Sequence, residues 1–286
     1  MQLGKFEEAL SDINKAIELN EKNCTYIYDK SLFLVDMQRY EEALVAIDKC
    51  IQIHPDSAKF WLQKGRILID INKYGEAVKA LNRATGLMPD MISAWSEKGI
   101  ALEKAGLFDE QVKVCDVLLK FKPDDIEISV QKANALKNLN KEIEANKIIL
   151  KLLEEDILNE ELWLIKAEID MHFKKYLDAL NNINCAIRLD VNYTAARLIR
   201  GIVYVKLDKQ RKALKEMEKI IKIAPDNKQA WYISALIYAV RKKKKKALMF
   251  LKRAIELDSN FKKEAKESIE FTFLYDDADF QALVSS

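Results

Sequence analysis

The chain has 286 residues, of which 49% are apolar and 32% charged, and it contains only seven glycines and four prolines. A composition so poor in helix breakers predicts a chain that is almost entirely helical. The 47 basic and 45 acidic residues leave a formal net charge of +2, so the charge of the chain as a whole points to no strongly basic or acidic partner. Because no apolar run approaches the ~18 residues that a membrane helix needs, we expect no membrane span.

A period of 34 residues organises the sequence. Pro55, Pro89 and Pro123 are each 34 residues apart, and Trp61 and Trp95 share that spacing. We therefore number the positions of each unit from 1 to 34. The pattern predicts a partial unit at residues 1–23, seven full units and a C-terminal segment at 262–286. The seven full units span residues 24–261 and begin at residues 24, 58, 92, 126, 160, 194 and 228.

Two positions of the unit hold small residues, which allow two helices to approach closely. Position 24 is apolar throughout, and with positions 20 and 27 it forms one helical stripe. Asp, Asn or Ser residues at positions 33 and 34 can cap the helix that follows, as at Asp56, Asp90, Asn159, Asn192 and Asn260. Position 8 holds Ser31, Gly65, Gly99, Ala133, Ala167, Gly201 and Ala235. Position 20 holds Ala9, Ala43, Ala77, Gln111, Ala145, Ala179, Ala213 and Ala247.

The repeated pattern resembles the tetratricopeptide repeat over residues 1–261. The unit that carries it most completely contributes Trp61, Gly65, Leu68, Tyr74, Ala77, Leu81, Ala84 and Pro89. The resemblance implies an all-α, right-handed solenoid of helix–turn–helix units, and the W-x2-K-G wording is similar to repeats of methanogenic archaea. Two units depart from the pattern, because Glu142 replaces the aromatic residue and Asp170 occupies a position that normally lies in the core.

The two ends of the sequence differ from the full units. Phe6, Ala9, Ile13 and Ala16 form the apolar face of a second helix that has no first helix before it. We expect either further repeats upstream or self-association through this face. Residues 262 to about 275 predict one more first helix, with Ile269 facing inward. Asp276 or Asp277 then caps a short final helix, and the segment serves as a cap for the array.

The resemblance implies a concave wall, lined by the first helices, that binds a protein or peptide partner. The wall is polar in the first half of the chain, where it offers Tyr28, Arg66 and Asn134. It becomes apolar in the last three units, where it offers Leu164, Glu168, Leu198, Ile199, Ile202, Val205, Tyr232 and Leu236. We expect an apolar or amphipathic peptide to bind there. The competing expectation is that neighbouring helices or the C-terminal Phe271, Phe273 and Leu274 bury this patch.

One known ligand mode of the family is excluded. Members that bind the C-terminal carboxylate of heat-shock chaperones carry Lys at position 5 and Asn at position 9 of one unit. No unit here supplies that pair; the fourth, for example, has Val130 and Asn134. The chain is therefore not of the carboxylate-clamp type.

Two groups of cations need an explanation. Position 7 holds Lys or Arg in six of seven units, where we expect each stem to cover apolar surface while its charge reaches water. The run Arg241, Lys242, Lys243, Lys244, Lys245 and Lys246 falls on the turn inside the last full unit. A solvated turn is the simpler interpretation. The alternative function is binding of nucleic acid or an anionic surface through this basic turn.

Motifs of catalysis are missing. His54 and His172 are the only histidines, with no second metal ligand at helical spacing, and no phosphate-binding or nucleophile motif occurs. We therefore predict a non-catalytic adaptor or scaffold without cofactor or metal; another possibility is an interaction fragment of a larger multidomain protein. The widely spaced Cys24, Cys50, Cys115 and Cys185 favour free thiols and a cytoplasmic location.

Overall fold

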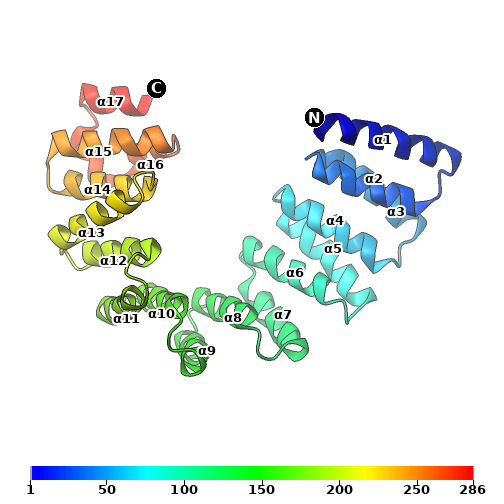
Figure 1. Cartoon of the computed structure of the whole chain (residues 1–286), viewed down its shortest axis with the longest axis horizontal. Helices are drawn as coiled ribbons and strands as arrows, with labels where there is room; N and C mark the ends of the chain where they lie inside the picture. The colour runs from blue at the N-terminus through cyan, green and yellow to red at the C-terminus, as the bar shows by residue number, and fades with distance from the viewer. Residues whose placement is uncertain (1, 286) are drawn as a thin grey trace. The chain divides into compact units, whose positions relative to one another are not determined.

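The computed structural model describes residues 2–285, with side chains from Glu7 onward. These residues form α-helices and one 3-10 helix, and no strand occurs among them (Figure 1). After α1 (Gln2–Leu19), helices alternate as first and second members of antiparallel pairs. The first members are α2 (Cys24–Asp36), α4 (Ala58–Asp70), α6 (Ile92–Ala105), α8 (Ile126–Asn138), α10 (Glu160–His172), α12 (Thr194–Lys206) and α14 (Lys228–Val240). The second members are α3 (Tyr40–Ile53), α5 (Tyr74–Leu87), α7 (Phe108–Phe121), α9 (Glu142–Glu155), α11 (Tyr176–Leu189), α13 (Gln210–Ile223) and α15 (Lys244–Leu257).

The chain divides into two compact units, one ending at Ile148 and the other beginning at Ile149. Within unit 1, each helix from α1 to α8 packs on the next, and α10 to α15 pack in the same serial way within unit 2. The prediction of an all-α solenoid of consecutive helix pairs is confirmed.

Small residues lie where the two helices of a pair touch. Ala43 and Ala77 are fully buried, and Gly65 faces Leu81 so closely that an added Cβ would lie 2.5 Å from the leucine Cγ. Gly201 faces Met217 in the same way, with 2.2 Å between such a Cβ and the methionine Cε. These contacts explain the small residues at positions 8 and 20, because a larger side chain would force the helices apart.

Each pair turns through one residue in the left-handed backbone region. These residues are 34 apart, and only one of them is glycine, although the conformation costs other residues roughly 1–2 kcal/mol. They are Gln38, Asn72, Gly106, Asn140, Lys174, Asp208 and Lys242. The turn therefore relies on the packing of the helices on either side of it rather than on glycine.

The predicted helix caps are wrong in four of five cases. In the part of the chain that the structure describes, Asn159 caps the next helix, but Asp56, Asp90, Asn192 and Asn260 do not. Asp56, Asp90 and Asn192 lie one residue too early, because a side chain reaches the free amides of the first turn from the residue directly before the helix. Asn260 does precede α16 directly, but its backbone is helical rather than extended. The residues that cap from position 34 are Asn23, Asp125, Asn159 and Asn227.

In five of the seven full units, the side chain at position 4 donates a hydrogen bond to a backbone carbonyl of the unit before it. The indole Nε1 of Trp61 donates to the carbonyl of Pro55 at 2.7 Å, and Trp95 bonds to Pro89 at 2.8 Å. Trp163 and Trp231 repeat the bond on Ile157 and Pro225, both at 2.9 Å. In the sixth unit Arg197 replaces tryptophan and donates to the carbonyl of Val191 at 3.1 and 2.6 Å. The hydrogen bond to the preceding unit therefore recurs at the same carbonyl position, with arginine as the donor in place of tryptophan.

The cations at position 7 make a second set of ties. Lys64 bonds to Asp48 at 2.7 Å, Lys132 to Asp116 at 2.6 Å and Arg200 to Asn184 at 2.9 Å. Each partner occupies position 25 of the preceding unit. The expectation that these charges reach water is therefore wrong for these three cations, which are bonded to a neighbouring unit. Two of the cations at position 7 lie over the tryptophan ring of their own helix: Lys98 Nζ is 4.8 Å from the ring centre of Trp95, and Lys64 Nζ is 5.8 Å from that of Trp61.

The C-terminal segment corrects another expectation. Instead of one long first helix, it forms α16 (Phe261–Glu267), the 3-10 helix η1 (Ile269–Leu274) and α17 (Ala278–Ser285). Ile269 is 77% exposed, whereas Phe271 and Leu274 are buried on α14 and α15. Asp277 caps the final helix through the amides of Asp279 and Phe280, as predicted.

At the other end, Ala9, Ile13 and Ala16 of α1 are half-buried, and Phe6 lies outside the described side chains. Leu10 is buried against α2 and α3. Self-association through this helix stays a prediction.

Candidate functional site

An apolar cleft of about 210 Å³ lies in unit 2 between α12 and α14. Ile202 and Val205 come from α12 and are one turn apart. Ile233, Leu236 and Val240 follow one face of α14 at the same helical spacing. The complete lining is Ile202, Val205, Lys206, Gln210, Ile233, Leu236, Ile237, Val240 and Glu270. The cleft thus has an apolar floor built from two neighbouring first helices.

Polar groups stand at the edge of this cleft. Lys206 ends α12, Gln210 begins α13, and Glu270 comes from η1, where its carboxylate accepts a hydrogen bond from Ser268 Oγ at 2.6 Å. The lining contains one carboxylate and neither His nor Cys. Such a set can orient a ligand through a few hydrogen bonds while apolar contacts supply most of the binding free energy.

The structure brings three of the predicted apolar residues together at the cleft: Ile202, Val205 and Leu236. Leu198 and Ile199 are half-buried and pack against core clusters of unit 2. Leu164 and Tyr232 are buried, at 6% and 8% exposure, and so do not line it. Glu168 is half-buried on α10. The predicted patch is therefore narrower than the sequence suggested and lies only in the last two full units.

Tyr232 is covered by the C-terminal segment. Its ring stacks on Phe261 with 4.4 Å between centroids and lies 6.5 Å from that of Phe271. Burial raises the pKa of its hydroxyl to about 12, and the charges of Glu264 and Glu270 act in the same direction. The competing expectation, that C-terminal aromatic residues fill part of the wall, describes this position correctly.

The predicted polar residues of unit 1 already have partners within the chain. Lys59 Nζ lies 4.0 Å above the ring centre of Tyr28, and Arg66 bonds to Glu97 at 2.8 Å. Asn134 accepts a hydrogen bond from Lys137 at 3.1 Å. A ligand would have to compete with these contacts.

Sequence reasoning missed five residues of the lining: Lys206, Gln210, Ile237, Val240 and Glu270. Lys206 and Val240 hold position 13, which belongs to the predicted wall, so their places were available in the sequence. Gln210 begins a second helix and Glu270 lies beyond the last repeat, and the 34-residue pattern says nothing of either. Their contribution depends on how α13 and the C-terminal segment pack.

The basic run spans the turn before α15 and its first residues. Lys244 forms ion pairs with Asp277 and Asp279, which raise its pKa, chiefly through the hydrogen bond to Asp277. Lys242 lies 4.2 Å from the ring centre of Phe273, and Lys246 lies 5.1 Å from that of Tyr238. A second cleft, of about 440 Å³, joins this turn to the preceding one and is lined by Asp208, Lys209, Gln210, Arg211, Lys212 and Arg241.

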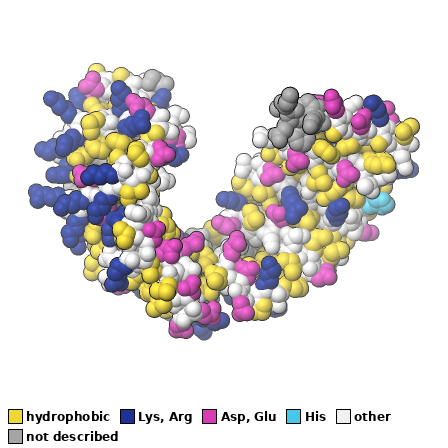
Figure 2. Space-filling view, viewed as in Figure 1, with side chains coloured by type: hydrophobic (Ala, Val, Ile, Leu, Met, Phe, Trp, Pro, Cys, Tyr) yellow, Lys and Arg dark blue, Asp and Glu magenta, His cyan; other side chains and the backbone are white. Residues whose placement is uncertain are grey.

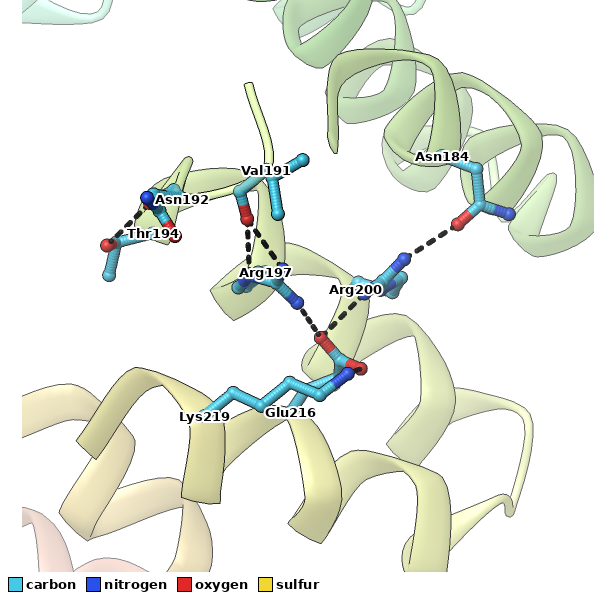
Figure 3. Close-up of polar contacts among 8 residues, drawn as sticks. All are labelled: Asn184, Val191, Asn192, Thr194, Arg197, Arg200, Glu216 and Lys219. Carbon is cyan, nitrogen blue, oxygen red and sulfur yellow. Dashed lines mark hydrogen bonds and ion pairs between the residues drawn. The ribbon is translucent and has the colours of Figure 1, made fainter. Parts of the chain in front are cut away.

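A buried ion cluster joins α11, α12 and α13 (Figure 3). Glu216 Oε2 accepts hydrogen bonds from Arg197 at 3.1 Å and Arg200 at 2.7 Å, and Lys219 approaches Oε1 at 3.4 Å. Arg200 also reaches Asn184 on α11. Burial raises the pKa of Glu216, but the hydrogen bond and charge of Arg200, with Lys219, outweigh burial and place the pKa below its ordinary value. The cluster is a packing feature of unit 2.

The buried Asp170 is accommodated by a similar arrangement. Its side chain is 2% exposed and accepts hydrogen bonds from Lys166 at 2.6 Å and Asn182 at 2.7 Å. A carboxylate at a core position is tolerated when its charge is paired and its oxygens are bonded. Asn182 and Glu216 both occupy position 23, which is apolar in the other full units.

Two searches bear on other kinds of site. Between residues 2 and 285, no three His, Cys, Asp or Glu side chains are placed to hold a metal ion together. Every helix in the same range is too short or too polar to cross a lipid bilayer.

Serial helix pairs with a 34-residue spacing define this protein as an α-solenoid of helix-pair repeats. Family models described as tetratricopeptide repeat match residues 1–23, 34–99 and 198–260. Since these matches together cover just over half of the sequence, the chain belongs to the tetratricopeptide repeat family.

Solved structures agree with this fold. A tetratricopeptide repeat protein from Parabacteroides merdae is similar with a TM-score of 0.69 and 15% identity, covering 92% of this chain and 97% of that one. Yeast Tom70 is similar with a TM-score of 0.63 and 16% identity, covering 98% of this chain and 59% of that one. At these identities the likeness concerns the fold alone. No curated protein sequence matches the chain.

Proposed function

We propose that the cleft between α12 and α14 binds an apolar or amphipathic segment of a partner protein, without catalysis. The observation that carries the proposal is that Ile202, Val205 and Leu236 meet in a cleft and stay partly exposed. An apolar side chain that fills the cleft would remove these residues from water. Membership of a family whose proteins typically mediate protein–protein interactions supports the same function.

The size of the cleft sets the scale of the interaction. It can receive one or two apolar side chains, and each buried anchor contributes at most ~1.5–3 kcal/mol. Ordering the peptide opposes this gain. Two anchors supply at most about 6 kcal/mol. A micromolar affinity corresponds to roughly 8 kcal/mol, so it requires further contacts beside the cleft.

The proposal is tested with a phage-displayed library of random peptides of about 16 residues, a length that holds four turns of helix. Peptides are selected on the wild-type protein and then compared on the Ile202→Asp/Leu236→Asp variant. We expect enriched sequences with apolar residues at helical spacing and no binding to the variant. Circular dichroism verifies that the variant keeps its helices.

Leu177→Asp is the matched control, because Leu177 is an apolar residue of α11 in the same unit, 62% exposed and outside the cleft lining. The control variant should bind the selected peptides as the wild type does. Equal binding to the cleft variant, or no enrichment of apolar peptides on the wild type, would contradict the proposal.

The wider role is a non-catalytic adaptor or scaffold that brings its partner to another component. A cytoplasmic location and a methanogen-like repeat style stay predictions from the cysteine spacing and the W-x2-K-G wording.

A further inference from the structure

The last two second helices of the repeat array, α13 and α15, begin with cations. The first turns of α3, α5, α7, α9 and α11 each contain Asp or Glu, whereas those of α13 and α15 contain none. Arg211 and Lys212 stand in the first turn of α13 and Lys244 to Lys246 in that of α15. A helix N-terminus carries partial positive charge, so cations there are unfavourable for the helix itself. The stability of the fold does not account for this reversal.

Most of these cations lack an acidic partner. Lys244 is paired with Asp277 and Asp279. Elsewhere on the two turns, among the described residues, no Asp or Glu forms an ion pair with a basic side chain. The basic side chains without such an ion pair are those of Lys209, Arg211, Lys212, Arg241, Lys242, Lys243, Lys245 and Lys246. Figure 2 shows Lys and Arg side chains gathered along one edge of unit 2, where Figure 1 places α13 and α15. The surface is therefore strongly positive locally, although the chain as a whole is nearly neutral.

The basic surface adjoins the apolar cleft. Gln210 lines both the apolar cleft and the cleft between the two basic turns. Val240 of the apolar cleft is followed directly by Arg241 of the basic one. A single extended or helical segment could therefore occupy both clefts.

We propose that the partner segment carries a cluster of Asp and Glu residues beside its apolar anchors, and that this acidic cluster lies between the turns at Lys209–Lys212 and Arg241. The inference rests on the proposed function and specifies its ligand. Arg211 and Arg241 face the same cleft and can each pair with a carboxylate through two hydrogen bonds. Asp208 in the same lining accepts a hydrogen bond from Gln210 at 3.2 Å, and the four cations of the lining outnumber this one carboxylate.

An acidic peptide fits these surfaces better than a nucleic acid does. Three aromatic rings, those of Tyr204, Tyr238 and Phe273, each have a lysine of the basic turns above them, which a stacking base would have to displace. The adjoining surface is an apolar cleft, which a phosphate backbone would leave empty. The two clefts together match a ligand that is apolar at one end and acidic at the other.

The experiment uses the peptides selected on the wild-type protein. We expect them to show an excess of Asp and Glu on one side of the apolar anchors. One selected peptide and its version with Gln and Asn in place of Glu and Asp are then titrated by fluorescence anisotropy. The acidic peptide should bind roughly three- to thirtyfold tighter, as expected for a few exposed charge pairs, and the difference should shrink with added salt.

Charge reversal locates the effect. In Arg211→Glu/Arg241→Glu the advantage of the acidic peptide should disappear, while the neutral peptide binds as before. The control Lys104→Glu/Lys120→Glu makes the same change of net charge on exposed residues of unit 1 and should leave the advantage in place. If apolar peptides are enriched without acidic residues, or both peptides bind equally, this inference is wrong while the proposed function stands. If no apolar peptide is enriched, the proposed function itself fails.

A nucleic acid is the competing outcome. An oligothymidylate is titrated at about 50 mM and about 200 mM salt, where phosphate contacts weaken steeply. We expect it to bind more weakly than the acidic peptide. Tighter binding that survives Ile202→Asp/Leu236→Asp and is lost in Arg211→Glu/Arg241→Glu would overturn the acidic-peptide inference.

Discussion

One methyl group at position 8 has a different effect in each unit that carries glycine there. At Gly65 an added Cβ would meet the branch point of Leu81, which cannot move without shifting the whole side chain. At Gly201 it would meet the flexible end of Met217, and at Gly99 it would lie 3.6 Å from Val114, an ordinary contact. The residue that faces position 8 therefore decides whether a methyl group fits. It does not fit at Gly65, fits at Gly201 if Met217 moves, and fits without change at Gly99.

We predict that Gly65→Ala destabilises unit 1 by about 1–3 kcal/mol, the usual effect of overpacking. Gly99→Ala should be neutral or stabilising by up to ~1 kcal/mol, since alanine favours helix over glycine. Gly201→Ala should fall between them. Urea unfolding followed by circular dichroism measures the midpoints. A midpoint for Gly65→Ala at or above that of Gly99→Ala would contradict the argument.

Among the residues that the structure describes, Glu216 is the single carboxylate that pairs with Arg197 and Arg200 in the interior of unit 2. Replacing it with Gln keeps the shape but leaves two buried cations without a counter-charge, so we expect a loss of about 3–5 kcal/mol. Glu42→Gln is the control, because it removes the exposed pair with Arg39 and should barely move the unfolding midpoint.

The same residue predicts a dependence on pH. Because the pKa of Glu216 is lower in the folded protein than its ordinary value of 4.5, its contribution is complete above that pH. The contribution is lost as pH falls below 4.5 toward the lowered pKa, since the unfolded chain then binds a proton that the folded one does not. Wild type should therefore lose stability more steeply than Glu216→Gln in acid, which thermal melts over that range can measure. Parallel curves would show that Glu216 titrates normally.

At the scale of the helix, the residue before each first helix decides whether its end is capped. Asn227 accepts a hydrogen bond from the amide of Ala230 at 2.9 Å, whereas Ser57 in the same position makes no cap bond. The two residues share an extended backbone at the cap position but differ in side chain and in cap bonding, which makes them a useful pair for comparison.

We predict that Asn227→Ala destabilises unit 2 by about 1 kcal/mol, the usual value for a cap. Ser57→Ala should have little effect, because the side chain it removes is not bonded to the helix. Hydrogen exchange of the first turns of α14 and α4 tests both variants. Faster exchange in α4 than in α14 would mean that the observed cap bond is not the relevant one.

The fold was predictable at this scale because its determinants recur. Small residues at positions 8 and 20 and a tryptophan at position 4 repeat in phase, and each has one physical task that the structure confirms at Gly65 and Trp61. Capping was predicted poorly, because positions 33 and 34 hold the same residue types and only backbone geometry separates them. The ion pair of Lys64 with Asp48 could have been predicted by comparing position 7 with position 25 of the preceding unit, but position 7 was considered alone.

The candidate site was less predictable, since it depends on parts that do not repeat. Ile202 and Leu236 were found because they are apolar at positions that the repeat does not need for its core. Tyr232 met the same criterion, yet it is buried by Phe261, the last residue of the seventh unit, and by Phe271, which lies beyond the 34-residue pattern. Glu270 was missed for the same reason.

At the scale of the molecule, the C-terminal segment acts as part of unit 2. Phe271 is fully buried among residues of α14 and α17, and it contacts the ring of Phe280. In repeat arrays each unit contacts only its neighbours, so a change at one end acts mainly on the adjoining units. The two compact units should accordingly respond separately.

We predict that Phe271→Ala destabilises unit 2 by about 3–5 kcal/mol, as expected for a large cavity in a core. Ile269→Ala, two residues away on the same 3-10 helix, should change little because Ile269 is largely exposed. Hydrogen exchange measured by mass spectrometry should show the loss in α14 to α17 and unchanged protection in α2 to α6. Uniform loss over both units would show that the chain unfolds as one block.

The cluster around Glu216 has a consequence for how a chain of near-identical pieces assembles in the correct order. If α15 took the place of α13 against α12, Phe250 would stand where Glu216 does, and two guanidinium groups would be shut in beside a benzene ring. That arrangement is strongly disfavoured because it leaves two buried cations without a counter-charge. A contact made only of alanines would not distinguish α13 from α15. We therefore expect this buried ion cluster to favour the pairing of α12 with α13 over its pairing with α15.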